Sequence, residues 1–185
     1  MIYIIDHQDS FTHNVVHQFE EFDEVVCTNF NKINKNKLNK AEVIVFSPGH
    51  GAPKDYPLSS KIYKQFKGQK KIIGICLGFQ QILYCENAKI IEQKKIYHGY
   101  QSKITVTSSN SLFKKNSKFD VGRYHSLKLQ EPFVAKNFEI TMRCAISKVA
   151  MAFENNKDKI YGFQFHPESF LTTNGNLLIK KILSA

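Results

Sequence analysis

Short apolar runs and helical apolar stripes alternate through the first half of this chain. Residues 41–46 and 70–75 are apolar runs of strand length, and both predict buried strands. Near the start, Ser10 can cap a helix whose apolar residues recur at a helical spacing, at Phe11, Val15, Phe19 and Phe22. This alternation predicts an α/β fold built on an open, mainly parallel sheet flanked by helices.

The second half of the chain is richer in strand patterns. Residues 102–107 and 149–154 predict additional antiparallel strands on the same sheet. Residues 175–184 predict a closing helix with Leu178 and Ile182 facing inward. At 185 residues the chain fits a single domain, 1–185, that can bury a substantial core.

The chain is strongly basic, with a formal charge of +10. A basic balance is common among nucleic-acid-binding proteins. Here nearly all of the excess is lysine, and its densest stretch, residues 31–40, mixes lysine with asparagine like a solvated connector. No aromatic residues interleave with those lysines, as base stacking would require. We therefore expect no nucleic-acid partner.

Cysteine usage and the absence of long apolar runs indicate the cellular compartment in which the protein is expected. The four cysteines, at positions 27, 76, 85 and 144, form no C-x-x-C pair and no metal-ligand spacing. No apolar run approaches the ~20 residues of a membrane span, and the first residues lack the basic region of a signal peptide. We expect a cytoplasmic protein with no membrane contact, no metal and a free thiol at Cys76.

Cys76 lies where a predicted strand turns into a predicted helix, in the sequence Gly74-Ile75-Cys76-Leu77-Gly78. A glycine-flanked residue at such a turn matches the nucleophile elbow, where the glycines allow a tight turn and leave room for a substrate. The helix N-terminus behind the cysteine favours its reactive thiolate. A lone cysteine is more often a small buried apolar residue, so the interpretation depends on partner residues elsewhere.

A histidine and a glutamate follow the apolar run 160–163. Pro167 favours extended geometry before it, so His166 and Glu168 are predicted to project to the same side. A histidine can carry a proton and a carboxylate can orient it, which is what a cysteine nucleophile needs. The pair alone is weak evidence, but together with Cys76 it forms a candidate Cys-His-Glu triad.

A third segment, Ser-Pro-Gly-His-Gly-Ala-Pro at 47–53, directly follows the predicted strand 41–46. One interpretation is an ordinary connecting loop between a strand and a helix. The other is a loop whose exposed amides bind a carbonyl oxygen or a carboxylate.

Together these segments resemble the class I (triad) glutamine amidotransferases, and most closely the small subunits of anthranilate synthase and aminodeoxychorismate (para-aminobenzoate) synthase. The resemblance covers essentially the whole chain and implies a flavodoxin-like core. It is carried by ordered motifs: IIDHQDSFTHN at 4–14, SPGHG at 47–51, GICLGFQ at 74–80, HG at 98–99, GRYHSL at 122–127, FQFHPES at 163–169 and LTTNG at 171–175.

The resemblance implies a role for each matching position. Cys76 resembles the nucleophile that attacks the glutamine side-chain amide, His166 the general acid/base and Glu168 the residue that orients it. The backbone amides of Leu77 and Gly51 resemble the oxyanion-hole donors. The positions that would hold glutamine are Gly49, His50, Gly51, Gln80, Ser126 and Leu127.

Three positions depart from the family pattern. His50 stands where the family usually has proline, Phe79 where histidine is common, and Tyr100 where lysine often follows the histidine-glycine pair. None of these removes a catalytic group, although His50 makes its loop less rigid. The resemblance gives His125 no triad role, which leaves packing or hydrogen bonding near the substrate. His13 and His17 are expected on a solvated helix face.

We therefore expect an enzyme subunit, without a cofactor, that hydrolyses L-glutamine through a cysteine thioester to glutamate and ammonia. The resemblance implies delivery of the ammonia to a separate chorismate-binding synthase subunit (component I), for para-aminobenzoate (folate) or anthranilate (tryptophan) synthesis. One alternative is an amidotransferase for another acceptor, such as a nucleotide synthase. The other is a non-enzymatic basic binding module, which would not need Cys76, His166 and Glu168 together. The sequence does not separate the two chorismate branches.

Overall fold

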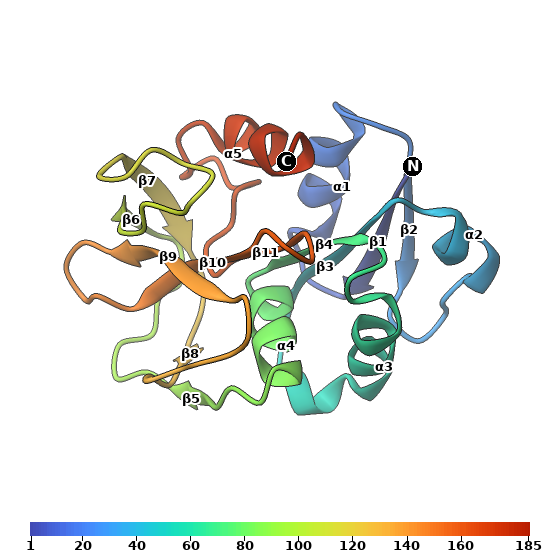
Figure 1. Cartoon of the computed structure of the whole chain (residues 1–185), viewed down its shortest axis with the longest axis horizontal. Coiled ribbons are helices and arrows are strands. Elements are labelled where there is room, and N and C mark those ends of the chain that lie inside the picture. The colour runs from blue at the N-terminus through green and yellow to red at the C-terminus, as the bar shows by residue number, and fades with distance from the viewer.

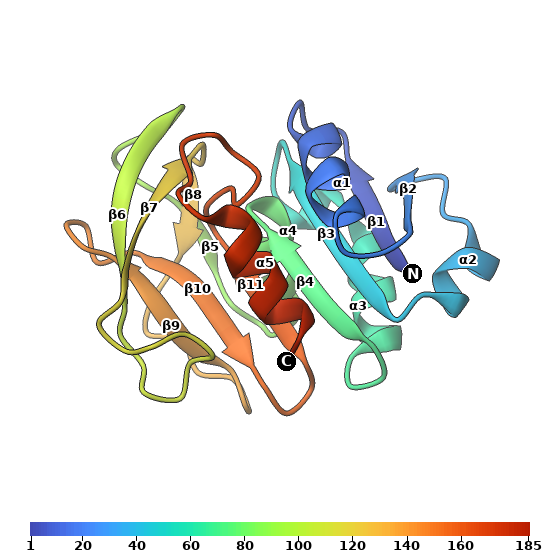
Figure 2. The ribbon, with the colours of Figure 1, turned by 90° about the horizontal axis from the view of Figure 1, so that it is seen from above.

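One nine-stranded sheet runs through the molecule, with helices packed on both of its faces (Figures 1 and 2). The computed structural model describes all of residues 1–185. The strand order is β2-β1-β3-β4-β11-β10-β9-β6-β7, and β5 and β8 form a separate two-stranded sheet. The strands are β1 (Ile2–His7), β2 (Val25–Asn29), β3 (Val43–Gly49), β4 (Lys71–Ile75), β5 (Ile90–Glu92), β6 (Tyr100–Val106), β7 (Lys118–Arg123), β8 (Leu127–Leu129), β9 (Glu139–Cys144), β10 (Ala150–Asn155) and β11 (Ile160–Phe163).

The large sheet changes from parallel to antiparallel at β11. β2, β1, β3, β4 and β11 are parallel to one another, and the pairs from β11 through β10, β9 and β6 to β7 are antiparallel. The first half supplies four of the five parallel strands, because a helix returns the chain between successive strands, and β11 is added from the second half. The prediction of an α/β fold with antiparallel additions is confirmed.

The helices cover the two faces of the parallel part of the sheet. In Figure 2, α1 and α5 lie over one face, and α3 and α4 lie over the other. Their bounds, with the short α2 and a 3₁₀ turn η1, are α1 (Thr12–Glu20), α2 (Lys35–Lys40), η1 (Pro53–Asp55), α3 (Pro57–Phe66), α4 (Leu77–Cys85) and α5 (Gly175–Leu183). No helix is both long enough and apolar enough to cross a bilayer.

Two hydrophobic cores result from the alternation of side chains along each strand. Ile2 and Ile4 of β1 join the core beneath α1 and α5, whereas Tyr3 and Ile5 join the core beneath α3 and α4. The predicted inward residues of the last helix, Leu178 and Ile182, are both buried. The carboxyl ends of β3, β4 and β11 consequently meet at one edge of a sheet covered on both faces.

The cap predicted for the first helix is wrong. Ser10 is exposed and makes no hydrogen bond with its side chain, and α1 begins at Thr12 without a side-chain cap. Asp9 takes this role from one residue earlier, because its carboxylate accepts from the Phe11 N–H at 2.8 Å and its carbonyl accepts from the Thr12 N–H at 3.1 Å. His13 and His17 are exposed on α1, as expected.

The lysine-asparagine stretch is more than the solvated connector that we expected. It contains α2, whose N-cap Asn34 accepts a hydrogen bond from the Lys37 N–H at 3.1 Å. Leu38 of this helix is only 4% exposed and packs into the core beneath α3 and α4. The buried Leu38 and the cap at Asn34 therefore hold in place a segment whose composition suggested a solvated connector.

Candidate active site

Cys76 occupies a strained turn between β4 and α4. Its backbone has φ +51° and ψ −99°, in a region that residues with a side chain rarely adopt. Such strain persists where surrounding contacts hold it, and it is characteristic of a nucleophile elbow. The turn lifts the cysteine off the end of β4 and leaves α4 to begin at the next residue, which confirms the predicted strand-turn-helix.

The glycines around Cys76 have a different role from the one predicted. Neither Gly74 nor Gly78 has a positive φ. A Cβ atom on Gly78 would overlap the backbone carbonyl of Phe46 on β3, and one on Gly74 would overlap the backbone of Gly78. These glycines therefore allow α4 to pack directly against the strands, and Cys76 itself carries the strained torsion angle. The expectation that they leave room for a substrate is wrong.

His166 and Glu168 form a buried pair. The Nδ1 atom of His166 is 2.6 Å from a carboxylate oxygen of Glu168, and their side chains are only 2% and 0% exposed. The predicted pairing is confirmed, but the chain between them is not extended. Residues 166–169 form a turn in which the Ser169 N–H donates to the His166 carbonyl at 3.2 Å, with Pro167 at its second position.

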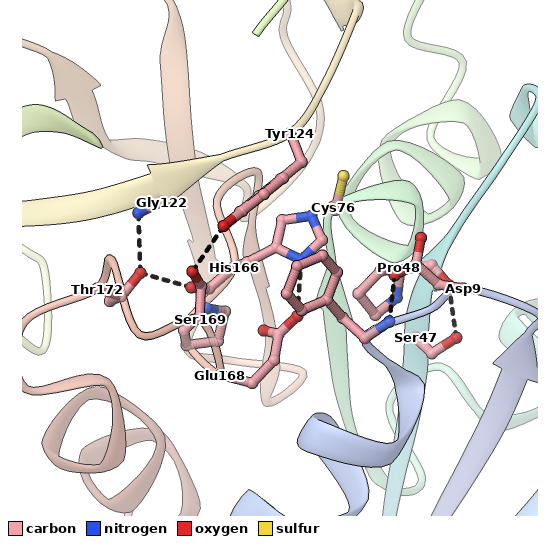
Figure 3. Close-up of polar contacts among 12 residues, drawn as sticks. Asp9, Ser47, Pro48, Cys76, Gly122, Tyr124, His166, Glu168, Ser169 and Thr172 are labelled. Carbon is pink, nitrogen blue, oxygen red and sulfur yellow. Dashed lines mark hydrogen bonds and ion pairs between the residues drawn. The ribbon is translucent and has the colours of Figure 1, made fainter. Parts of the chain in front are cut away.

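The backbone of His166 is held from two sides. It pairs with Gly122 on β7, because the His166 N–H donates to the Gly122 carbonyl at 3.0 Å. The Thr172 hydroxyl donates to the His166 carbonyl and accepts from the Gly122 N–H (Figure 3). Two rings contact the imidazole, with centroids 5.4 Å away for Phe11 and 4.9 Å away for Tyr124. Sequence reasoning placed Phe11 on the apolar face of the first helix and gave Tyr124 no role, although both lie in the quoted motifs.

The electrostatic environment keeps a proton on His166. Burial alone would lower the pKa of His166, but the charges on Glu168 and Cys76 outweigh it and raise that pKa well above its usual value. The Nε2 atom is buried and makes no hydrogen bond to another part of the chain. Figure 3 shows the Cys76 sulfur on the side of the imidazole away from Glu168. The arrangement can move a proton between the cysteine and the histidine.

A cavity of about 310 Å³ opens beside Cys76. It brings together residues of the 47–53 loop, the start of α4 and the segment that follows β7. All six of the predicted glutamine-binding positions line it. So does His125, for which packing or hydrogen bonding near the substrate was expected, and so do Asp9 and Tyr124, which sequence reasoning did not place there. A larger hollow of about 690 Å³ is lined mainly by residues 40–43, 68–71 and 157–159 and contains none of the predicted site residues.

Among the backbone N–H groups at this cavity that have no hydrogen-bond acceptor within the chain are those of Leu77, the first residue of α4, and Gly51. Gly51 has φ +73°, a value that favours glycine. Its loop is anchored by the Tyr56 hydroxyl, which donates to the His50 carbonyl at 2.9 Å, and by Asp55, which accepts from the Ala52 N–H at 2.9 Å. Free donors on an anchored loop and a helix N-terminus suit an oxyanion.

Two glutamine side chains connect the cavity wall to the sulfur. Gln80 donates to the side-chain carbonyl of Gln164 at 3.1 Å, and Gln164 donates to the Cys76 sulfur at 3.8 Å. Gln80 is only 3% exposed, and its side-chain nitrogen also donates to the Leu127 carbonyl at 3.5 Å. Gln164 lies in the quoted motif at 163–169, but nothing in the sequence distinguished it from its neighbours.

Comparison with known proteins gives one consistent result at the level of sequence. The family model for glutamine amidotransferase class-I matches residues 3–185. The chain is 40% identical to anthranilate synthase component 2 of Lactococcus lactis, over all of this chain and 94% of that protein. It is 32% identical to aminodeoxychorismate synthase component 2 of Klebsiella aerogenes, over the full length of both.

Solved structures agree on the fold. A protein from Thermoplasma acidophilum, described as a GMP synthase subunit, superimposes with a TM-score of 0.84 at 21% identity, over 99% of this chain and 92% of that one. A glutamine amidotransferase from Thermotoga maritima gives a TM-score of 0.72 at 16% identity, over 90% and 75% of the two chains. At these identities the likeness concerns the fold alone.

Proposed function

The chain belongs to the glutamine amidotransferase class-I family, and we propose that it is the glutaminase subunit of a chorismate-using synthase. In this proposal it hydrolyses L-glutamine to glutamate and ammonia and delivers the ammonia to a separate synthase subunit. The observation that carries it is the buried His166–Glu168 pair beside the strained Cys76. A binding module would have no use for a desolvated imidazole-carboxylate pair next to a cysteine.

The first half of the reaction forms a thioester. With the proton of the Cys76 thiol held on His166 Nε2, the Cys76 sulfur attacks the side-chain amide carbon of glutamine bound in the cavity. The carbonyl oxygen becomes an oxyanion, to which the N–H groups of Leu77 and Gly51 donate. Loss of one such donor typically costs on the order of 10²–10³ in rate. His166 then protonates the leaving nitrogen, which departs as ammonia.

The second half releases glutamate. His166, now neutral again at Nε2, takes a proton from water as the water attacks the thioester carbon. The same two backbone donors stabilise the second oxyanion, and the imidazolium returns its proton to the departing Cys76 sulfur. Glu168 stays hydrogen-bonded to Nδ1 throughout and stabilises the charged imidazole in both halves.

The identity of the acceptor rests on the relatives. Two full-length relatives are named as component 2 of anthranilate synthase and of aminodeoxychorismate synthase, and each name implies a component 1. We assign this chain the same kind of partner, a chorismate-binding synthase subunit. Its 185 residues share one nine-stranded sheet, with a two-stranded sheet beside it and the cavity at a single edge, which supports one amidotransferase domain spanning 1–185.

We place the reaction in the reducing cytoplasm. All four cysteines of the chain are free, and Cys76 has to remain a thiol for thioester chemistry.

Reconstitution tests this function directly. The chain should be mixed in turn with an anthranilate synthase component 1 and an aminodeoxychorismate synthase component 1, and product formation measured with glutamine and with ammonium as the nitrogen source. We expect glutamine-dependent product with at least one partner. Cys76→Ala should abolish it and leave the ammonium-dependent reaction intact, because added ammonia bypasses the thioester.

Cys27→Ala is the matched control, because Cys27 is exposed and lies outside the cavity. It should keep full glutamine-dependent activity. Glutamine-dependent turnover by Cys76→Ala would disprove the nucleophile, and a complex that uses ammonium but never glutamine would disprove the function.

A further inference from the structure

Arg123, the last residue of β7, is a fully buried arginine without an acidic partner. It is 0% exposed, and no aspartate or glutamate forms a salt bridge with it. Its guanidinium lies 3.5 Å from the centroid of the Tyr97 ring, one of its nitrogens contacts the Cys144 sulfur at 3.5 Å, and another has no partner. A buried charge without a counter-charge weakens the fold, so its remaining contacts identify what it does here.

The one nitrogen acceptor of Arg123 is His125. The Nε atom of Arg123 donates to Nε2 of His125 at 3.0 Å. A guanidinium can only donate, so this ring nitrogen must accept, and a neutral imidazole must then carry its proton on Nδ1. Burial, together with the charge of Arg123, lowers the pKa of His125 to about 3, so the ring is neutral near pH 7.

The fixed proton on His125 points at the cavity wall. Nδ1 lies 2.8 Å from the carbonyl oxygen of Leu127 and 3.1 Å from the side-chain nitrogen of Gln93. The Gln93 nitrogen is itself a donor, so the Leu127 oxygen is the acceptor for the Nδ1 proton, and this oxygen also receives the side chain of Gln80 at 3.5 Å. Gln93 secures the other end of the segment, because its side chain donates to the His125 carbonyl at 2.6 Å and its backbone N–H donates to the Ser126 carbonyl at 2.9 Å. The backbone of 125–127 is therefore held at successive carbonyls.

We infer that His125, held in a single tautomer by Arg123, is a positioning residue that fixes the Ser126–Leu127 wall against which glutamine binds. This inference rests on the proposed function. His125 lies on the cavity wall with this segment, and the proton that Cys76 exchanges goes to His166, so His125 acts on substrate binding and leaves the chemical step to the triad.

Two substitutions of His125 separate the two ring nitrogens. His125→Gln can keep an acceptor near Arg123 but places no donor at the Nδ1 position. His125→Asn keeps a donor near the Leu127 carbonyl and loses the acceptor. We expect His125→Gln to raise the KM for glutamine about tenfold, with kcat changed less than about threefold, and His125→Asn to raise it less. The measurement is steady-state kinetics of the complex with its synthase subunit.

The reactivity of Cys76 does not depend on the Ser126–Leu127 wall, so it distinguishes a loss of substrate positioning from a general disruption of the active site. The rate at which iodoacetamide alkylates Cys76, followed by peptide mass spectrometry, should match wild type in both variants. Arg143→Met is the matched control for Arg123→Met, because Arg143 is the chain's other arginine and pairs with Glu131 at the surface. Only Arg123→Met should raise the KM.

The tautomer of His125 can also be measured in the unaltered protein. Nitrogen-15 NMR of histidine-labelled wild type should show His125 as the Nδ1–H tautomer near pH 7, and an Nε2–H tautomer would overturn the inference. So would a wild-type KM in folded His125→Gln, or a loss of kcat and of alkylation with KM unchanged. A wild-type complex without any glutaminase activity would instead disprove the proposed function.

Discussion

The backbone N–H of Cys76 donates a 2.8 Å hydrogen bond to the carbonyl oxygen of Phe163. This bond continues the parallel pairing of β4 with β11, in which Ile75 lies opposite Phe163. It places the nucleophile at the level of the strand end that leads into His166. The two reacting side chains, far apart in the chain, thus meet because two neighbouring parallel strands end together.

Glu168→Gln should slow the enzyme far more than it weakens substrate binding. The charge of Glu168 helps to raise the pKa of His166 against the effect of burial, so its removal should lower that pKa and destabilise the imidazolium. We expect kcat to fall about 10²-fold or more, with KM changed only a few-fold. Steady-state kinetics with the synthase subunit present measure both.

The same substitution should alter how stability depends on pH. A histidine whose pKa is raised on folding stabilises the protein fully below its unfolded value of 6.5, and this contribution is lost as the pH rises through the folded pKa. Urea denaturation should show this loss in wild type and less of it in Glu168→Gln. Glu154→Gln is the control, because Glu154 is also buried but accepts from Ser111 and Leu112 outside the site. A near-normal kcat in folded Glu168→Gln would contradict its role.

Gly78→Ala should be strongly destabilising because of the close approach of α4 to β3. The new Cβ would overlap the Phe46 carbonyl, a backbone group that cannot move aside. We expect a loss of about 3 kcal/mol or more in the free energy of unfolding. Gly68→Ala is the comparison: Gly68 has φ +73°, but its new Cβ would make only an ordinary contact with Asp158 at 3.8 Å, so strain alone should cost about 1 kcal/mol. Equal losses in the two variants would refute the packing argument.

His50→Pro should make the subunit more active on its own. Gly49 is already in β3 and the His50 N–H donates no hydrogen bond within the chain, so proline removes no bond and restricts φ in a loop that carries the Gly51 donor. We expect a low kcat for the isolated wild-type chain and a large stimulation by the synthase subunit. The variant should have a several-fold higher unassisted kcat and a smaller stimulation.

Tyr56→Phe should have the opposite effect on the same loop, because it removes the hydroxyl that donates to the His50 carbonyl. Its unassisted kcat should be lower than that of wild type. If kcat is the same with and without a synthase subunit that is shown to bind, gating by the partner is wrong for this protein, and the triad assignment remains.

His7 should make the fold sensitive to acid. Its ring is 0% exposed, with Nδ1 3.2 Å from the Ser47 carbonyl and Nε2 2.9 Å from the Ser59 hydroxyl, and burial lowers its pKa from 6.5 to about 4. The neutral ring therefore supports the fold above about pH 6.5, and up to about 3 kcal/mol is lost as the pH falls to about 4. His7→Asn should reduce this pH dependence in urea denaturation. An unchanged slope, or the same effect from the exposed His13→Asn, would contradict it.

Local features of the site could be predicted from the sequence because they depend on neighbours along the chain. The run 70–75, the cysteine after it and the apolar spacing of α4 predicted the elbow. The His-Pro-Glu order predicted the pairing of His166 with Glu168, although the backbone makes a turn there. The cap at Ser10 failed because the turn before α1 forms one residue earlier: the Asp9 carboxylate accepts from the Phe11 N–H and the Asp9 carbonyl accepts from the Thr12 N–H.

The sequence by itself determined the reacting groups, the alternation of strands and helices and, through its ordered motifs, the family. The tertiary structure alone decided which surfaces meet. The strand order placed Cys76 beside His166. The close approach of α4 to β3 explains why residue 78 is a glycine. Arg123 is buried against Tyr97, and its Nε donates to His125. The physical reason is that propensity and spacing act over a few residues, whereas pairing, packing and desolvation depend on atoms that the chain brings together only when it folds.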